Sequence, residues 1–364
     1  MKTRLLVPFL VFALTTANSQ ICHDLNLEEK LLASPYQENT QGQLYLLGET
    51  HGFAENFDIQ LWHIKQLHAM DSLRQVILEI PAGFEFYIEK YLKDGKIDAF
   101  KEIVFQKRQG SVFSSEEFIQ FMQDFRKWNK SLPANQKVKL IPVDAESDPS
   151  TTLRAMLQMI PNGSIPKEIN VTVDMMVRFR NDGVFTSEKM TILANQLEGN
   201  FLSFQGTYYE LLGDYYPMYY RSLMSLINSA YRPREIAMYF NIVQYFTNAE
   251  THGNSFGQFG ALHCRSGKSD KTGYFLGQML NAEKLSPFKG AVHSGLIVYA
   301  GEESEEGLPV APVLPFIQSQ IERYCEGDNA LIDLNVKKPA FEEEAKQFNF
   351  ILLVDGVTDI TPLD

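Results

Sequence analysis

Short apolar runs, bounded by glycine, proline or charged residues, alternate along this chain with longer stretches of helical periodicity. In the longer stretches, apolar residues recur three or four positions apart, as they do on one face of a helix. Strands that alternate with helices are typical of an α/β fold, in which a central, largely parallel sheet is flanked by helices. The runs that predict the strands cover residues 43–48, 75–80, 138–143, 256–262, 289–298 and 348–354.

Helices are predicted between the early strands and throughout the middle of the chain. Ser115 precedes one of the early helices and is its predicted N-cap. Residues from about 174 to 250 show helical periodicity without a convincing strand, which indicates a helical insertion or cap on the α/β core. Aromatic residues concentrate over 201–245 and favour core packing, the alternative being an aromatic wall on a substrate cleft. The early helices are predicted at residues 56–73, 84–92 and 114–128.

The N-terminus has the pattern of a secretory signal. Lys2 and Arg4 precede a short apolar stretch over residues 5–14, and small residues follow up to Ser19. A membrane span would require about 18 apolar residues. We therefore expect cleavage after Ser19 and a secreted or periplasmic protein, the alternative being an apolar N-terminal helix that packs on the core.

Composition limits the class of partner. The chain has 33 Lys+Arg against 45 Asp+Glu, a formal net charge of −12, and this acidic balance argues against nucleic acid. Residues 20–364 contain no low-complexity linker and no stretch apolar enough to span a membrane, so we expect one domain. The chain has three cysteines, and an odd number cannot all be paired within one exported chain. Either Cys264 and Cys325 form a disulfide bridge, or both remain free or buried thiols, as Cys22 does.

Glu49 and His51 follow the first predicted strand, within the sequence Gly-Glu-Thr-His-Gly. Residues two apart in an extended chain point to the same side. The carboxylate can then orient the imidazole, fix its tautomer and raise its basicity, as a general base requires. Ligands of α/β sheets bind at the carboxyl ends of the strands. An acid and a histidine between two glycines at such an end favour a catalytic site over a solvated loop pair.

Acidic residues also end the next two predicted strands. Glu79 lies near the end of the second strand, where a carboxylate is costly unless it is paired or catalytic. Asp144 follows the third strand, and a role in the site and a cap on a helix near Pro149 explain it equally well. His293, next to Ser294 in a predicted strand, is a weaker candidate for the lining of the cleft.

The Gly-Glu-Thr-His-Gly turn resembles the erythromycin esterase-like family, and further segments follow in that family's order over residues 43–280. Glu79 matches the acidic residue that closes the second strand of the family. The single residue between Glu49 and His51 is also similar to two groups that share this core, the ChaN-like haem-binding-uptake proteins and the Tiki metalloproteases. The other matching segments are residues 115–129 before Asp144, the helix with Arg234, Glu235, Met238 and Asn241, residues 260–264 with His263, and residues 273–277.

This resemblance implies a hydrolase-like site in which His51 is the general base that activates water. Glu49 and Glu79 would orient His51 or handle protons, and His263 would assist. The expected site therefore consists of the catalytic residues His51, Glu49, Glu79 and His263, with Asp144, Arg234 and His293 as substrate-binding residues.

Three functions remain open on these residues. The leading hypothesis is metal-independent hydrolysis of an ester or lactone-type bond in a small-molecule substrate, without a cofactor. The second is a metal-dependent hydrolase in which Glu49, His51, Glu79 and His263 bind Zn²⁺ or Mn²⁺, although no HExxH spacing is present. The third is a protein that binds a small ligand such as haem and performs no chemistry.

Overall fold

Eight strands form one sheet in the parts of the chain that the computed structural model describes, namely residues 22–24, 42–71, 73–108, 112–147, 149–247, 253–266, 275–299, 330–334, 342–354 and 357–363. Their order is β1-β7-β8-β6-β2-β5-β3-β4. All pairings from β8 to β4 are parallel, whereas β7 pairs antiparallel with β8 and β1. The predicted α/β fold with a largely parallel sheet is confirmed. The strands are β1 (Cys22–Asp24), β2 (Leu44–Glu49), β3 (Leu73–Pro81), β4 (Lys139–Asp144), β5 (Asn254–Gly260), β6 (Val292–Tyr299), β7 (Ala330–Asp333) and β8 (Phe350–Val354).

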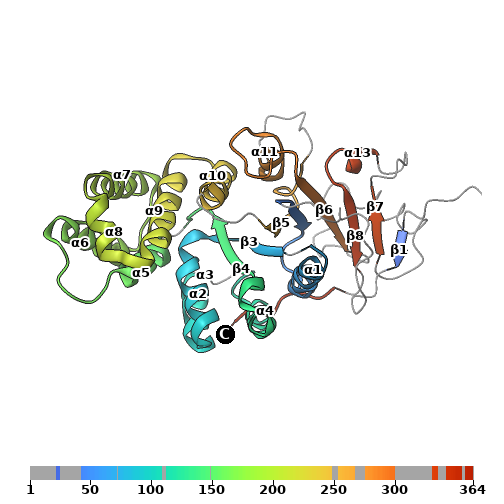
Figure 1. Ribbon diagram of the computed structural model, residues 1–364, viewed down its shortest axis with the longest axis horizontal. Coiled ribbons are helices and arrows are strands. Elements are labelled where there is room, and N and C mark those ends of the chain that lie inside the picture. The colour runs from blue at the N-terminus through green and yellow to red at the C-terminus, as the bar shows by residue number, and fades with distance from the viewer. Residues whose placement is uncertain are drawn as a thin grey trace, which may run out of the picture.

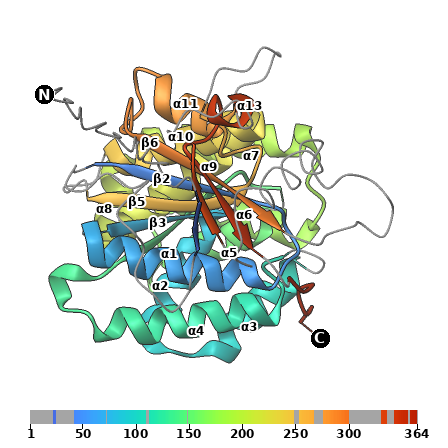
Figure 2. The ribbon, with the colours of Figure 1, turned by 90° about the vertical axis from the view of Figure 1, so that its right-hand side faces the viewer.

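Helices cover both faces of the sheet. Figure 1 shows α1 and α4 below it and α10 and α11 above it, and Figure 2 shows the same layers from the side. Helices α5 to α9 form a group of their own at the end of the molecule nearest β4 (Figure 1). The helices are α1 (Glu55–Asp71), α2 (Glu85–Asp94), α3 (Ile97–Arg108), α4 (Glu116–Ser131), α5 (Ser150–Met159), α6 (Lys167–Asp182), α7 (Ser187–Ser203), α8 (Gln205–Leu212), α9 (Tyr216–Tyr231), α10 (Arg234–Thr247), α11 (Leu276–Ala282) and α13 (Glu342–Ala345), with 3₁₀ turns at Ala82–Phe84, Ala134–Gln136 and Gly213–Tyr215.

Side chains of the central strands alternate between two hydrophobic clusters. In β2, Leu44 and Leu46 belong to the cluster that includes α10 and α11, whereas Tyr45 and Leu47 belong to the cluster that includes α1 and α4. All four side chains are buried. A parallel strand that is covered on both faces must be apolar at successive positions, which explains why these strands were visible as continuous apolar runs.

The tyrosines of the helical group contribute mainly to its interior. Tyr208 and Tyr219 are buried, with ring centroids 5.5 Å apart, and Phe201 packs 5.1 Å from Tyr208. Tyr209 and Tyr215 are exposed. The core-packing interpretation therefore holds for the inner rings of this group. The group itself begins with α5, before residue 174, where the sequence analysis placed the start of the helical insertion.

Several elements differ from the prediction in type or extent. Leu73 does not end α1 but begins β3, where it is buried and pairs with Asn254 of β5. Helix α3 and the strands β1 and β7 were not predicted. Pro142 lies in β4, which is an edge strand and tolerates the missing N–H.

Two expectations concern residues outside the described ranges. The predicted signal over residues 1–19 and the residue Cys325 both lie there.

Cys264 has a buried free thiol, with a pKa that burial raises well above its ordinary value, so this thiol is a poor nucleophile. Among the helices of the described residues, none is long and apolar enough to cross a membrane.

Ser115 caps α4 as the sequence predicts, and its Oγ accepts a hydrogen bond of 3.1 Å from the N–H of Phe118. We expect Ser115→Ala to lower the free energy of unfolding by about 1 kcal/mol, because the first turn loses an acceptor. Urea denaturation of the variant measures the change. Ser131→Ala, at the exposed end of the same helix, is the control, and equal losses in the two variants would refute a specific capping role.

Candidate active site

Four adjacent parallel strands, β2, β5, β3 and β4, bring polar residues to their carboxyl ends. Glu49 at the end of β2 is paired in register with Gly260 at the end of β5. On the other side of β5, β3 carries Glu79, and Pro81 at its end is paired with Asp144 of β4. The strand order therefore brings Glu49, Glu79 and Asp144 to one edge of the sheet, where a ligand site of an α/β fold is expected.

His51 is held by Glu49, with His51 Nδ1 and Glu49 Oε1 2.8 Å apart. The second oxygen of Glu49 accepts a hydrogen bond from the Gln258 amide, which also donates to the carbonyl of Asn56. The Asn56 amide in turn donates to the carbonyl of Thr50 at 2.8 Å. Since Glu49 binds Nδ1–H, the other ring nitrogen, Nε2, is the one that can exchange a proton with a substrate or water.

Glu79 is the central acceptor of the site, and its side chain is only 3% exposed. Its Oε2 accepts a 2.8 Å hydrogen bond from the N–H of Gly260, and its Oε1 accepts one from the Arg234 guanidinium. His263 Nε2 lies 3.4 Å from Oε1, and His51 Nε2 lies 3.7 Å from Oε2. Four donors thus surround one buried carboxylate, which offsets the cost of its removal from water.

Arg234, the first residue of α10, joins Glu79 to Asp144. Its Nε lies 2.9 Å from Asp144 Oδ1, and its terminal nitrogen Nη2 lies 3.0 Å from Oδ2, which makes a bidentate pair. Asp144 does not cap the following helix, because α5 has Pro149 at its N-cap position and no side-chain cap. Asp144 therefore lies in the candidate site, where it is the partner of Arg234, and it is not a helix cap.

His263 forms a second acid–imidazole pair. Its Nδ1 is hydrogen-bonded to Glu235, and the other oxygen of Glu235 accepts a 2.8 Å hydrogen bond from the N–H of Leu276 at the start of α11. Gly260 lies between the two histidines, because a Cβ at this position would be 3.0 Å from His51 Nε2 and 3.5 Å from His263 Cδ2. A side chain at residue 260 would therefore push the imidazoles out of place.

Carboxylates keep both imidazoles charged. The hydrogen bond to Glu49 and then the interaction with Glu79 raise the pKa of His51 to about 10. Burial acts to lower the pKa of His263, but hydrogen bonds to Glu235 and Glu79 outweigh it and raise this pKa to about 9. Burial acts to raise the pKa of Glu79, but its interactions with the two charged histidines hold this pKa well below its ordinary value. At neutral pH both imidazoles are protonated and Glu79 is ionised.

The groups that reach solvent are hydrogen-bond donors. The side chains of His51 and Arg234 are 42% and 49% exposed, whereas Glu49, Glu79 and Asp144 are nearly covered. Arg234 Nη1 lies 3.3 Å from His263 Nε2, which cannot accept a hydrogen bond while it is protonated. The hydrogens of Nη1 are therefore available to a substrate oxygen.

This donor set fits a divalent cation poorly. Both oxygens of Glu79 already accept hydrogen bonds, one of them from the charged guanidinium of Arg234. His51 and His263 would each have to lose a proton before they could bind a metal ion. Within the described ranges, no three His, Cys, Asp or Glu side chains are arranged to hold a metal ion together.

His293 does not join the cluster. It is the second residue of β6 and pairs in register with Tyr45, at the amino-terminal half of β2. Its Nε2 lies 2.8 Å from Oε1 of Gln43, and its ring stacks on Tyr45. The sequence predicted a strand over residues 289–298, in which His293 would lie in the interior. The observed strand begins at Val292, so His293 lies at its start, and the starts of these parallel strands form the edge of the sheet opposite the site.

Three participating residues were given no role from the sequence: Gln258, Asn56 and Glu235. Gln258 is buried in β5 and lies two positions before Gly260, so both face the same side of the strand. A polar residue in a buried parallel strand was the available signal for Gln258. Asn56 and Glu235 lie in the first turns of helices, where polar residues are too common to stand out.

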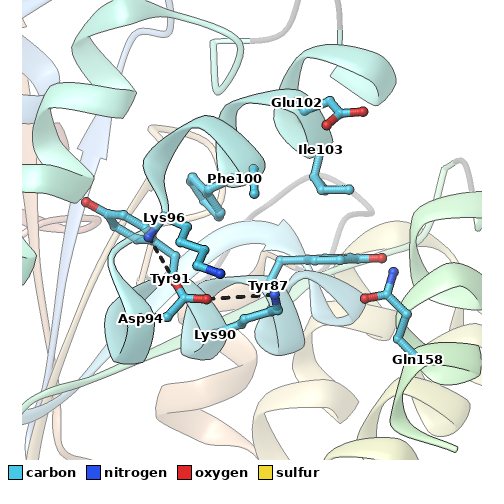
Figure 3. Close-up of a pocket in the computed structure, with 10 residues that line it drawn as sticks. Tyr87, Lys90, Tyr91, Asp94, Lys96, Phe100, Glu102, Ile103 and Gln158 are labelled. Carbon is cyan, nitrogen blue, oxygen red and sulfur yellow. Dashed lines mark hydrogen bonds and ion pairs between the residues drawn. The ribbon is translucent and has the colours of Figure 1, made fainter. Parts of the chain in front are cut away.

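A separate cavity of about 170 Å³ lies between α2 and α3. Figure 3 shows that Tyr87, Lys90 and Tyr91 border it from α2, with Phe100 from α3 and Gln158 from α5. None of the predicted site residues lines it. The cavity is therefore distinct from the cluster around Glu79.

Comparison with known proteins identifies relatives in fold. No family model and no curated protein matches the sequence. A Bacillus cereus protein of solved structure has 15% identity and a TM-score of 0.64, covering 89% of this chain and 91% of its own. A succinoglycan biosynthesis protein has 14% identity and a TM-score of 0.63, covering 89% and 90%. A mutant of the erythromycin esterase EreC, in its open conformation, has 12% identity and a TM-score of 0.63, covering 89% and 93%.

These comparisons establish the class of the protein at the level of fold. The chain has an α/β fold similar to that of an erythromycin esterase over most of both chains. At 12–15% identity the likeness is one of fold alone. Activity must therefore be argued from the site.

We expect Arg234→Met to lower the free energy of unfolding by about 2 kcal/mol, because it leaves the buried Glu79 without its guanidinium. Adding Glu79→Gln to this variant should recover part of the loss, since an unpaired amide costs less to bury than an unpaired carboxylate. Chemical denaturation of the single and double variants tests both points.

Arg232→Met is the matched control, because Arg232 lies at the same corner but contacts the amide of Asn228 and the ring of Phe240. A change below about 1 kcal/mol is expected there. Equal destabilisation by the two arginine variants would contradict a specific role for the pair of Arg234 and Glu79.

Proposed function

We propose that this protein is a hydrolase that cleaves an ester or lactone-type bond in a small-molecule substrate, with His51 as the group that activates water. The observation that carries the proposal is the state of the His51 ring. Glu49 fixes its Nδ1, and its Nε2 lies 3.7 Å from Glu79, too far for a hydrogen bond, on a half-exposed side chain. This nitrogen is therefore available to a water molecule. The likeness in fold to an erythromycin esterase is consistent with the proposal.

In the proposed reaction, neutral His51 takes a proton from water at Nε2 while the water oxygen bonds to the carbonyl carbon. The bond from that carbon to the leaving oxygen then breaks, and His51 returns the proton to the leaving alkoxide. The negative charge that develops on the carbonyl oxygen is stabilised by the available hydrogens of Arg234 Nη1. Glu79 stabilises the imidazolium that His51 becomes during the first step.

The raised pKa of His51 has a direct consequence for the rate. With a pKa of about 10, only about one His51 in a thousand is neutral at pH 7. A general base must be neutral, so we expect kcat/KM to rise about tenfold per pH unit from pH 7 to about pH 9, where His263 is still protonated. The measurement is turnover of a panel of ester and lactone substrates by the mature protein, with His51→Asn expected to lose about 10³-fold in kcat/KM.

His68→Asn is the control for this experiment, because His68 also lies in the described part of the chain but bonds the carbonyl of Gln136, away from the site. A rate that falls as pH rises from 7 to 9 would overturn the general-base role and identify His51 as an acid. Loss of turnover on chelation, with recovery on adding Zn²⁺ or Mn²⁺, would favour the metal-dependent alternative. Absence of turnover together with a Soret band on adding haem would favour the ligand-binding alternative.

We also propose that the protein is exported, on the basis of the basic residues and the short apolar stretch that precede Ser19. Expression of the full chain in a bacterial host should yield a mature protein that begins at Gln20. N-terminal sequencing of the secreted or periplasmic fraction measures this. An intact N-terminus on protein retained in the cytoplasm would refute the proposal.

A further inference from the structure

A segment far from His51 in the sequence lies against the turn that carries it. Residues 357–363, here called the strap, run from the start of α1 to the start of α4. Figure 1 shows the strap as the red trace that passes these helices and leads to the C-terminus beside α4. The strap contributes no side chain to the cluster around Glu79.

The strap bonds to the backbone directly after His51. The N–H of Ile360 donates to the carbonyl of Gly52 at 2.9 Å, and the N–H of Ala54 donates to the carbonyl of Thr358 at 2.9 Å. Phe53 and Asp359 are thereby paired as in a two-stranded antiparallel ladder. Gly52 has φ of +107°, a backbone conformation that favours glycine.

Two acidic residues clamp the strap in place. The Glu55 carboxylate, at the start of α1, accepts hydrogen bonds of 2.9 and 2.8 Å from the N–H and the hydroxyl of Thr358. The Glu117 carboxylate, at the start of α4, accepts from the N–H of Thr361. Further along, the N–H of Leu363 donates to the carbonyl of Ser114 at 2.9 Å. Glu55 therefore holds the end of the strap near His51, and Glu117 holds the other end.

Besides the hydrogen bond from the Asn56 amide to the carbonyl of Thr50, two sets of backbone-to-backbone hydrogen bonds flank His51. On one side, the carbonyl of Glu49 accepts a 2.8 Å hydrogen bond from the N–H of Ala261, as part of the sheet edge. On the other side, Gly52 and Ala54 are bonded to the strap. The His51 side chain is half-exposed, so packing alone does not fix it. The strap therefore supplies the second of these two sets.

We propose that the strap is a positioning element of the site, which holds the His51 turn so that the imidazole stays between Glu49 and Glu79. This inference rests on the proposed function only for the claim that the position of His51 matters for catalysis. The hydrogen bonds between the strap and the His51 turn do not depend on the proposed function. The rival explanation is that the strap stabilises the fold in general, with no specific effect on His51.

Two proline variants separate these explanations. Ile360→Pro and Leu363→Pro each remove one backbone donor and one partly buried aliphatic side chain from the strap. Only Ile360 donates to the His51 turn. The pKa of His51, followed by NMR titration of its ring in the full-length chain, is the readout, because it reports the distance of the imidazole from its two carboxylates without requiring turnover.

In Ile360→Pro we expect the pKa of His51 to fall from about 10 by at least one unit toward its ordinary value of about 6.5. In Leu363→Pro it should stay near 10, while the thermal midpoints of both variants fall to a similar extent. An unchanged pKa in Ile360→Pro, or an equal fall in both variants, would overturn the proposal. An intact chain with His51 at pKa 10 and no turnover would instead refute the proposed function and leave the strap's role standing.

A milder pair covers the case in which a proline prevents folding. Glu55→Ala and Glu117→Ala each remove the carboxylate that binds a strap threonine, and the raised pKa of His51 is attributed to Glu49 and Glu79 rather than to either of them. The proposal requires a lower pKa of His51 in Glu55→Ala than in Glu117→Ala. It also requires Glu55→Gln, which keeps one acceptor oxygen, to restore most of the difference. Equal pKa values in the two alanine variants would overturn it.

Discussion

The burial of one carboxylate, that of Glu79, determines the arrangement of the residues around it. An ionised group that is removed from water needs donors with good geometry, or it destabilises the fold. The donors around Glu79 come from the end of β5, from α10 and from the turns after β2 and β5. Three separate parts of the chain, besides β3 itself, must therefore be in their native positions before this carboxylate is compensated. The same requirement brings two histidines and an arginine to one point.

The fold could be predicted because parallel strands that are covered on both faces are apolar throughout, a pattern that is local in the sequence. The strands β1 and β7, at one end of the sheet, are short, and nothing in their composition distinguishes them. Strand order is not a local property. β5 lies about 175 residues after β3 in the chain, yet it separates β2 from β3. The placement of His293 beside Gln43, at the opposite edge, depends on the same non-local pairing.

The candidate site was partly predictable for a similar reason. Glu49, His51 and Glu79 stood out because polar residues interrupt or end apolar strands, and the family resemblance added His263 and Arg234. Their protonation could not be predicted, because it depends on partners that are distant in sequence. Each imidazole has its own carboxylate on Nδ1 and faces the shared Glu79 with Nε2. That nearly symmetrical arrangement was visible only in three dimensions.

Thr358 and Glu55, which are hydrogen-bonded to each other, are 303 residues apart in the chain. A ribosome synthesises the chain from its N-terminus and therefore delivers the His51 turn about 300 residues before its strap. Contacts of such long sequence separation form late in folding, because the intervening chain must first be ordered. A nascent or prematurely terminated polypeptide can thus assemble much of the sheet while the His51 turn still lacks its hydrogen bonds to the strap. The site is therefore completed only after the strap has been synthesised, later than most of the scaffold that carries it.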